Sequence, residues 1–597
     1  MYKTAEHWQR IGTKLRAGVV TPLFSIYSKD SIGIGEIPDL KLLIDWCKKV
    51  NISIVQLLPL NDTGFKFTPY DSESAFALDP MYLSLSNIAG IESKFFKKAI
   101  EELGKRFKKH GRRIDYEIKK EKLRILEKMF DSIYFPSKKL PKKCQSFIND
   151  NKYWMNDYAC YRTLKEKHNQ QAWVNWEEKY KNRKREAILE IEKTEEKTIQ
   201  FYKWLQWQTY IQMLDSKKYA GKNNVLVLGD LPLLVSADSA DVWSHKEYFL
   251  LEKATGTPPD IDFVKGQRWS MPPYNWNELE KNEFNYFTQK LKYAENFYDM
   301  YRIDHFLGLF RLWIIDNKEL LEHGGVNGKY FPENPEEWEV QGRKIIEKML
   351  NSTKMLPCGE NLGTVPKCAN EALNYYLIPG IEVQRWAFQD FKNNSTDKNY
   401  NISMLSTHDT STFIEWWEDE CGTANAEFMH KLCTENGLNY ENIKNQLFDL
   451  QLSTSKTLRW KPEINSIEKL LEIIHLSPEK FQGFKYVYTA TFGGKQNFWD
   501  YLKMTGRVPY KPTKKLIYKA IKKCAEAKAL FSIQLLQDLL SLGNYFDNWD
   551  KTNLRINVPG TISDKNWNVV LPISLEKLLS APINHTIKKI NISAGRS

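Results

Sequence analysis

The sequence lacks the features of several large protein classes. No uncharged apolar run approaches 18 residues, so a membrane-spanning helix is not expected. Only 29 glycines and 24 prolines occur among 597 residues, which excludes a collagen-like or largely disordered chain. The eight cysteines include no Cys-x-x-Cys pair, and the polar first 16 residues contain no apolar signal core. These absences predict a cytoplasmic protein whose large hydrophobic core needs no disulfides.

The motifs of several catalytic schemes are also missing. We find no Gly-x-Ser-x-Gly elbow, no His-Glu-x-x-His helix and no phosphate-binding Gly-x-x-x-x-Gly-Lys-Ser/Thr loop. No Gly-x-Gly-x-x-Gly follows a predicted strand. The sequence therefore gives no support to a serine-hydrolase, zinc-protease or nucleotide-dependent mechanism.

The net charge is positive, at +12, because 86 Lys and Arg exceed 74 Asp and Glu. The excess lies in segments with a helical pattern, at residues 119–122, 179–185 and 514–528. Such segments usually form a solvated surface, whereas a nucleic-acid groove needs the charge on one face with interleaved aromatic residues. We therefore expect these lysines and arginines to be exposed, and we expect no nucleic-acid partner.

Aromatic residues are abundant, at 13% of the chain, with 19 Trp, 30 Tyr and 30 Phe. Two interpretations remain open. The rings could simply fill the core. They could also form flat platforms for sugars or bases, since a sugar ring presents an apolar C–H face to a π-surface.

Eight short apolar runs rich in β-branched residues end in polar or charged residues. Near-continuous apolar runs of this length are typical of strands buried on both faces of a parallel sheet, and eight of them predict a (β/α)8 TIM barrel. Residues 37–50 have the apolar spacing of the first barrel helix. The runs are residues 18–26, 53–60, 225–235, 300–306, 355–362, 380–386, 402–409 and 531–540.

Two long gaps interrupt the even spacing of the runs. Residues 85–215, between the second and third strands, and residues 415–525, between the seventh and eighth, have helical periodicity and many charges. They are too long and too regular in pattern for linkers. We interpret them as large, mainly helical insertions on barrel loops, within a single catalytic unit spanning residues 1–597.

Acidic residues occur at the ends of four predicted strands: Asp230, Asp304, Glu360 and Asp409. The active site of a TIM barrel lies at the carboxyl ends of its strands. Placing four acids together there without a functional reason costs electrostatic free energy, because like charges repel. Two chemistries use such a cluster: a divalent metal with oxygen ligands, and glycoside chemistry with one nucleophilic and one proton-donating carboxyl group.

The segment around Arg302 and Asp304 favours glycoside chemistry. Residues i and i+2 of a strand point to the same side, so both side chains are expected to face the barrel mouth. A guanidinium lowers the pKa of an adjacent carboxyl and keeps it ionised, as a nucleophile requires, whereas a metal site gains nothing from a cation. A purely structural Arg–Asp pair remains the alternative.

These strand ends, together with stretches along the whole chain, resemble a known family. The chain resembles the amylomaltases, the 4-α-glucanotransferases of glycoside hydrolase family 77 in the α-amylase clan. Residues 301–313, 416–420 and 573–597 are most similar to the plant-type cytosolic disproportionating enzymes, whose starch-binding modules are expected to be absent because the first barrel strand begins near residue 18. The matching stretches are residues 57–63, 69–77, 229–232, 238–243, 256–260, 266–269, 302–306, 359–363, 407–410 and 557–561.

The resemblance implies a role for each matching residue. Asp304 would be the nucleophile, Glu360 the general acid/base, and Asp409 the group that stabilises the distorted transition-state sugar. Asp230, Arg302 and His408 would line the same sugar subsite. Tyr70 and Trp269 would stack on glucose units, and Gln267 would lie on a loop over the cleft. These are the residues Tyr70, Asp230, Gln267, Trp269, Arg302, Asp304, Glu360, His408 and Asp409.

The chain departs from the family pattern in two places. It has Glu360-Asn361 where the family usually has Glu-Asp, and Asn566-Trp567-Asn568 without the second Arg that often follows the family's Asn-Trp. The first departure concerns how the pKa of the acid is adjusted, and the second concerns packing beneath the barrel. Neither removes a catalytic group.

The sequence thus predicts a retaining 4-α-glucanotransferase that moves α-1,4-glucan or glucosyl units between maltooligosaccharides or glycogen-like glucans. This chemistry needs no metal or organic cofactor. Two alternatives remain: an α-glucan hydrolase of the same clan, and a glucan-binding protein with an inactive site. The sequence does not indicate an oligomeric state.

Overall fold

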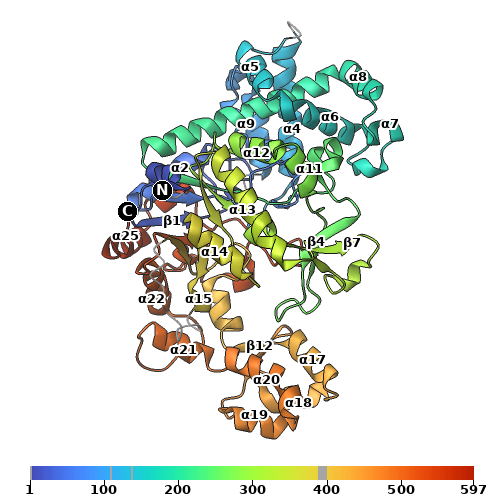
Figure 1. The fold of residues 1–597 in the computed structure, drawn as a ribbon. Coiled ribbons are helices and arrows are strands. Elements are labelled where there is room, and N and C mark those ends of the chain that lie inside the picture. Colours follow the sequence, from blue (N-terminus) through green and yellow to red (C-terminus); the bar gives the residue numbers. More distant parts are fainter. Residues whose placement is uncertain (1–2, 108–110, 136–138, 388–399) are drawn as a thin grey trace.

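A closed barrel of eight parallel strands organises the chain (Figure 1). The computed structural model describes residues 3–107, 111–135, 139–387 and 400–597. Every barrel strand lies in one of the eight predicted apolar runs or overlaps it, so the predicted (β/α)8 fold is confirmed. In order around the barrel, the strands are β1 (Arg16–Val20), β2 (Ile54–Gln56), β3 (Leu226–Leu231), β6 (Met300–Ile303), β9 (Leu356–Gly359), β10 (Gly380–Val383), β11 (Asn401–Met404) and β15 (Phe531–Leu535).

Barrel closure depends on pairing between β1 and β15. Five residues of each strand are in register, from Arg16 opposite Phe531 to Val20 opposite Leu535. All ten are buried, because side chains fill the inside of the barrel and helices cover its outside. The covering helices include α2 (Asp39–Lys49), α12 (Asn285–Ala294), α13 (Pro335–Ser352), α14 (Lys367–Tyr376), α22 (Lys514–Ala525) and α25 (Ile583–Ser593).

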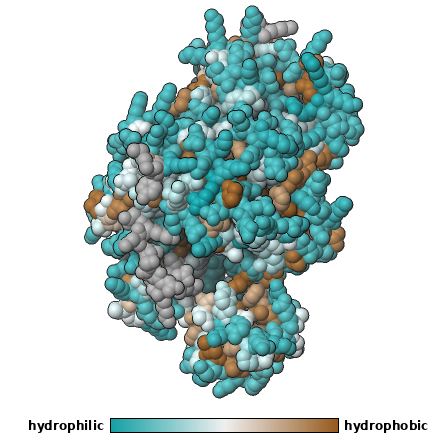
Figure 2. Space-filling model, in the orientation of Figure 1, coloured by the Kyte–Doolittle hydropathy of each residue, from teal (hydrophilic) through white to brown (hydrophobic). Residues whose placement is uncertain are grey.

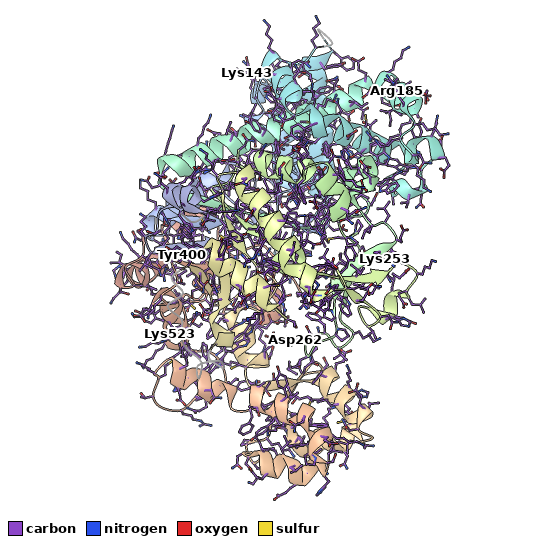
Figure 3. All side chains as sticks on the ribbon, viewed as in Figure 1. Lys143, Arg185, Lys253, Asp262, Tyr400 and Lys523 are labelled. Carbon is purple, nitrogen blue, oxygen red and sulfur yellow. The ribbon has the colours of Figure 1, made fainter. Side chains whose placement is uncertain are left out.

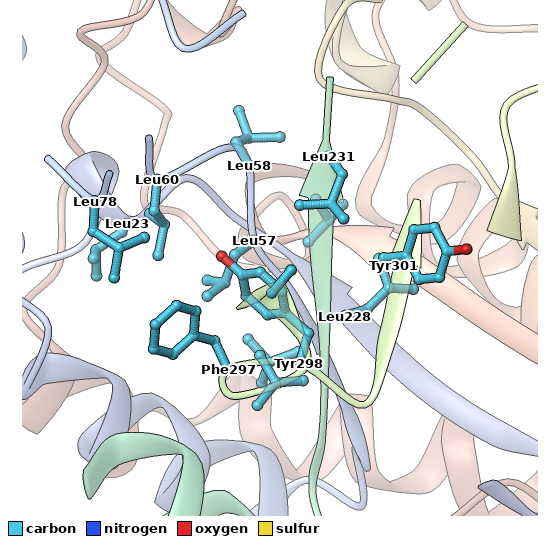
Figure 4. Close-up of a cluster of buried hydrophobic side chains, with 14 of the residues drawn as sticks. Leu23, Leu57, Leu58, Leu60, Leu78, Leu228, Leu231, Phe297, Tyr298 and Tyr301 are labelled. Atoms are coloured by element: carbon cyan, nitrogen blue, oxygen red, sulfur yellow. The ribbon is translucent and has the colours of Figure 1, made fainter. Parts of the chain in front are cut away.

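The core around β3 shows how tightly the barrel packs. Figure 4 shows Leu57, Leu228, Leu231 and Tyr298 in one cluster of buried hydrophobic side chains. A Cβ atom on Gly229 would lie 2.4 Å from the ring of Tyr298, so only glycine fits at this position. The close approach fixes the strand immediately before Asp230.

In its described residues, the segment between β2 and β3 contains seven α-helices. The last of these helices extends past residue 215 to Lys222, and it packs against α2 and β3. Within the predicted range, residues 108–110 and 136–138 lie outside the described part of the chain. The helices are α3 (Lys97–Phe107), α4 (Glu117–Tyr134), α5 (Lys142–Asp150), α6 (Lys152–Lys167), α7 (Glu178–Lys181), α8 (Arg185–Thr194) and α9 (Glu196–Lys222).

The segment between β11 and β15 forms a small lobe that extends from the barrel (Figures 1 and 2). Seventeen buried residues between Ala424 and Tyr488 form a hydrophobic core separate from the main one. Its elements are β12 (Thr423–Asn425), α17 (Ala426–Glu435), α18 (Tyr440–Leu447), β13 (Phe448–Asp449), β14 (Thr457–Trp460), α19 (Ile467–Ile474) and α20 (Pro478–Thr491), and α21 (Gly494–Tyr501) leads back to the barrel.

A second sheet lies beside the barrel and carries two of the predicted substrate-binding residues. We expected Gln267 on a loop, but it begins strand β5, and Trp269 ends it. The hairpin before β5 contains Asp262, which Figure 3 places near the boundary with the small lobe. The four antiparallel strands are ordered β5 (Gln267–Trp269), β4 (Lys253–Thr257), β7 (Leu312–Asp316) and β8 (Lys329–Phe331).

Two lysines that we expected at the surface are buried. The side chains of Lys119 and Lys122 on α4 are 1% and 0% exposed. Lys119 Nζ lies 2.9 Å from Asp62 Oδ1 and 2.8 Å from Asp79 Oδ2, and Lys122 Nζ lies 2.6 Å from Glu36 Oε1. Burial of an ion is tolerated only when partners compensate it, which explains why the two lysines reach these acids.

The Lys119 ion pairs fasten the segment of residues 57–83 that follows β2. Arg162 on α6 makes a further buried ion pair with Glu73 in the same segment. The insertion helices therefore hold a loop that begins at the carboxyl end of a barrel strand. That loop carries Tyr70, so its position matters to the predicted site.

All eight cysteines are free, and seven of them are buried. No helix in the described part of the chain is long and apolar enough to cross a membrane.

We expect Lys119→Met to lower the free energy of unfolding by ~3–5 kcal/mol, because it leaves buried Asp79 without its cation and Asp62 with only the more distant Arg162. Lys120→Met changes the exposed neighbour on the same helix and should change stability by less than ~0.5 kcal/mol. Urea denaturation of both variants measures the difference. Equal midpoints would show that the buried pairs do not support the fold.

Candidate active site

The guanidinium group of Arg302 lies at the centre of the barrel mouth. Its Nη1 is 2.8 Å from both carboxylate oxygens of Asp230 and 2.9 Å from Asp304 Oδ1. Its Nη2 is 3.0 Å from Glu360 Oε2. Arg302 and Asp304 do face the same side, as the alternation of β6 predicts, and one cation brings together carboxylates from the ends of β3, β6 and β9.

The four acids differ in their access to solvent. The side chain of Asp230 is fully buried, whereas those of Asp304, Glu360 and Asp409 are 25%, 20% and 35% exposed. A substrate can therefore reach three of the carboxyl groups but not the fourth. Asp230 acts as a fixed counter-ion that orients Arg302.

His408 and Asp409 complete the cluster from the end of β11. His408 Nε2 lies 3.0 Å from Asp409 Oδ2 and 2.8 Å from the hydroxyl oxygen of Tyr70. The Tyr70 hydroxyl donates its single proton to Asp230 Oδ2 at 2.8 Å, so the proton between Tyr70 and His408 belongs to Nε2. The rings of Tyr70 and His408 stack at 5.3 Å with an interplanar angle of 10°.

The protonation of Asp304 differs from the expectation. Burial and the carboxylates of Glu360, Asp230 and Asp409 together raise the pKa of Asp304 to about 7, although Arg302 acts in the opposite direction. The i, i+2 pair alone predicts a lowered pKa. The prediction fails because burial, together with acids that come from distant strands, outweighs the effect of one guanidinium.

Asp409 has the opposite behaviour. Burial disfavours its charge, but the imidazole of His408 and the amide of Asn557 lower its pKa to about 2. The Asn557 Nδ2 atom donates to Asp409 Oδ1 at 2.8 Å. Burial also opposes charge on His408, yet the Asp409 carboxylate raises the pKa of that imidazole above its ordinary value. Asp409 is therefore ionised wherever the protein is folded near neutral pH.

Glu360 is held by the backbone as well as by Arg302. The backbone N–H of His305 donates to Glu360 Oε2 at 2.7 Å. His305 has a left-handed backbone, with φ 48° and ψ 54°, which is uncommon for a residue other than glycine and often marks a functional turn. This turn directly follows Asp304, so one short segment positions both proposed reactive carboxyl groups.

Trp269 and Gln267 lie at the edge of this arrangement. The Trp269 ring contacts the imidazole of His305 edge to face, with centroids 5.1 Å apart, and its Nε1 donates to Gln267 Oε1 at 3.1 Å. In the described structure, neither residue makes a hydrogen bond or ion pair with the Arg302 cluster, by which we mean Arg302 and the acids Asp230, Asp304, Glu360 and Asp409 with Tyr70 and His408. They border the site on the side of the second sheet.

Three contributors to the site were not assigned a role from the sequence: His305, Asn557 and Trp567. Trp567 packs its ring 5.5 Å from Tyr70 and 6.2 Å from His408. Asn557 belongs to a stretch that carried the family resemblance, so the motif was visible although its function was not. The backbone N–H of His305 has no side-chain signature that a sequence could reveal.

The first departure from the family pattern does not touch the acid. Asn361 Oδ1 accepts a hydrogen bond from the Ile381 backbone N–H at 2.9 Å, and its amide lies under Gly380 of β10. Its side chain therefore ties β9 to β10 and is directed into the sheet. Within the described residues, no group of three or more His, Cys, Asp or Glu is arranged to hold a metal ion.

Comparison with known proteins decides the family. A family model described as 4-alpha-glucanotransferase, glycoside hydrolase family 77, matches residues 21–574. The chain belongs to this family. It is 31% identical to the 4-alpha-glucanotransferase of Chlamydia pneumoniae, across 98% of this chain and 97% of that protein. These matches identify an enzyme, a 4-α-glucanotransferase that works as a transglycosidase.

Two further relatives extend the comparison. The rice (Oryza sativa subsp. japonica) 4-alpha-glucanotransferase DPE2 is 33% identical over 53% of this chain, which is 34% of the rice protein. An amylomaltase from Streptococcus agalactiae, solved in complex with acarbose, has a TM-score of 0.71 at 20% identity. That match covers 98% of this chain and 100% of the other, and it supports the barrel fold with its insertions.

The raised pKa of Asp304 predicts a pH profile. If ionised Asp304 attacks the substrate, kcat/KM must fall as pH decreases through about 7, where Asp304 takes up a proton. Glu360→Gln removes one of the negative charges that raise this pKa. In this variant, the fall of kcat/KM on the acid side of the profile should therefore move to lower pH. An activated α-maltosyl fluoride donor allows both proteins to be measured.

Glu337→Gln, which neutralises an exposed carboxyl group on α13, is the matched control and should leave the profile unchanged. An acid limb at the same pH in wild type and Glu360→Gln would contradict the coupling of the two carboxyl groups.

Proposed function

We propose that this enzyme transfers α-1,4-glucan units by a retaining double displacement in which Asp304 and Glu360 react. One observation supports the assignment most directly: a single guanidinium holds both of these partly exposed carboxyl groups. Bridging by one small cation favours the short separation of a retaining pair, ~5 Å, over the ~6.5–9.5 Å that an inverting pair needs to admit water.

In the first step, a carboxylate oxygen of Asp304 attacks the anomeric carbon of the donor glucan. Glu360 gives its proton to the departing glycosidic oxygen, and a β-glucosyl-enzyme forms. In the second step, the 4-hydroxyl of an acceptor glucan attacks that carbon while Glu360 takes up its proton. Asp304 leaves, and the new bond has the original α-configuration.

The remaining groups position the sugar and its charge. Asp409 stays ionised and is oriented by Asn557 and His408, so it can accept hydrogen bonds from the sugar as positive charge develops on the ring. Buried Asp230 keeps Arg302 and Tyr70 in place. The Tyr70 ring, backed by Trp567, offers a platform for the same glucose unit.

The substrate class follows from the family and from this site. We infer that maltooligosaccharides and glycogen-like glucans are both donors and acceptors. The Streptococcus agalactiae amylomaltase was solved with acarbose bound, which supports a subsite for oligosaccharides in this fold. The proposed steps use only side chains of this chain. We also propose a cytoplasmic location and no nucleic-acid partner.

Transfer must compete with hydrolysis, because water is present in large excess. Trp269 borders the site next to His305, where its ring can stack an acceptor sugar and cover the intermediate. The four-stranded sheet fixes the backbone that carries this ring. We therefore assign Trp269 to the acceptor side of the site.

Asp304→Asn should lower disproportionation of maltotriose by several orders of magnitude with the fold intact, because the nucleophilic charge is lost while the shape is kept. Product sizing by chromatography measures transfer, and circular dichroism checks folding. Glu360→Gln should also fail on maltotriose but still form the covalent intermediate from a fluoride donor, whose leaving group needs little protonation. More than about a tenth of wild-type transfer by Asp304→Asn would remove it as the nucleophile.

With maltotriose, the wild type should yield longer glucans plus glucose or maltose, with hydrolysis as the minor reaction. Trp269→Ala should raise the ratio of hydrolysis to transfer, because water gains access to the intermediate. Trp313→Ala removes the same kind of side chain from β7 of the same sheet and should leave the ratio unchanged. A wild type that forms no longer products at any acceptor concentration would identify a hydrolase.

A further inference from the structure

A second recess lies away from the Arg302 cluster, between α6, α12 and the short helix α10 (Ala240–Ser244). Its volume is about 230 Å³. That equals the space of about eight water molecules at ~30 Å³ each and is enough for one hexose unit. No residue of the Arg302 cluster lines it. We call it the α6–α12 pocket.

Aromatic rings form the inner wall of the α6–α12 pocket. Tyr248 and Tyr286 lie 5.9 Å apart, and Phe76 stacks on Trp154 at 5.6 Å with an interplanar angle of 8°. All four are at least 92% buried, so their rings are fixed by packing. They leave a small apolar area toward the recess, against which the C–H face of a sugar can pack.

Amide side chains form the rim. Asn285 and Gln289 lie one turn apart on α12, the first exposed and the second half-buried. Across the whole described chain, neither side-chain amide has a hydrogen-bond partner, so both donors and acceptors are available to a ligand. Asn282 is also at the rim, and its Nδ2 donates to the Tyr248 hydroxyl at 2.8 Å.

Two carboxylates define which ligands fit. Asp157 at the rim is paired with Arg183, and Asp241 at the base accepts hydrogen bonds from Tyr286 Oη at 2.9 Å and from the Ala75 N–H at 3.0 Å. Acids at rim and base disfavour an anionic ligand. A purely apolar ligand would leave the free amides of Asn285 and Gln289 without partners. A neutral sugar fits both the aromatic wall and the amide rim, because its ring has apolar faces and its edges carry hydroxyl groups.

We propose that the α6–α12 pocket binds a glucosyl unit of a long α-glucan whose other segment occupies the Arg302 site. This inference rests on the proposed function, because it takes its ligand from the same substrate class. Binding at two points on one polymer raises the effective concentration of the chain at the active site. The proposal requires the two points to lie further apart than maltotriose can span, so the pocket should matter for glycogen and not for maltotriose.

The test uses Asn285→Ala/Gln289→Ala, which removes both free amides from exposed or half-buried positions. In an Asp304→Asn background, binding to glycogen is measured without turnover, by retardation in gels that contain glycogen. We expect the double substitution to weaken retardation about tenfold, as the loss of two neutral hydrogen bonds implies. In the active enzyme, kcat/KM for glycogen should fall while kcat/KM for maltotriose stays within about twofold.

The matched control is Asn442→Ala/Gln446→Ala on α18 of the small lobe. It changes the same residue types at the same spacing on an exposed helix, and it should leave retardation unchanged. Gln289→Trp, which fills the recess from its rim, should reproduce the loss caused by the double substitution.

Unchanged retardation in both pocket variants would mean that the recess holds only water, and it would overturn the proposal. An equal fall for maltotriose and glycogen would overturn it as well, because that result indicates a general structural effect. Failure of the wild type to disproportionate maltotriose would instead reject the proposed function. The retardation assay would still test whether the pocket binds glycogen.

Discussion

Charge balance in the barrel mouth is the constraint on which the site depends. Four carboxyl groups, Asp230, Asp304, Glu360 and Asp409, face one guanidinium and one imidazole. Arg302 neutralises the buried Asp230 and still contacts Asp304 and Glu360. Burial and the excess of acids over cations both favour a bound proton, and this appears as the raised pKa of Asp304. In the proposed mechanism Asp304 must lose that proton before it attacks, while Glu360 donates a proton to the leaving group and takes one back in the second step.

The scaffold around this cluster is built to keep its geometry. β6 supplies Arg302 and Asp304, and the left-handed turn at His305 brings a backbone N–H to Glu360. Two strands away from β6, the buried pairs of Lys119 and Arg162 fasten the loop after β2 that carries Tyr70. Buried ion pairs contribute little net stability, but breaking one leaves an uncompensated charge, so they restrict the loop to one arrangement.

The fold was largely readable from the sequence, and the electrostatics were not. Strands buried on both faces leave continuous apolar runs, and the alternation of a strand places Arg302 beside Asp304. Helical periodicity, by contrast, does not show whether an acid faces Lys119, so a buried lysine looks like a surface lysine. The pKa of Asp304 depends on carboxyl groups that lie far apart in the sequence. Asn557 became interpretable only when its amide was seen on Asp409, and the α6–α12 pocket only when the segments that line it were seen together.

The pairing of β1 with β15 bears on how the chain is made. Arg16 lies opposite Phe531, so the strand that closes the barrel follows its partner by about 500 residues. At a synthesis rate of ~5–20 residues per second, β1 leaves the ribosome on the order of half a minute to two minutes before β15 exists. Throughout that interval, one edge of β1 has unpaired N–H and C=O groups that can form hydrogen bonds with non-native strands. The nascent barrel therefore has to be protected during synthesis, either by its own insertion helices or by chaperones.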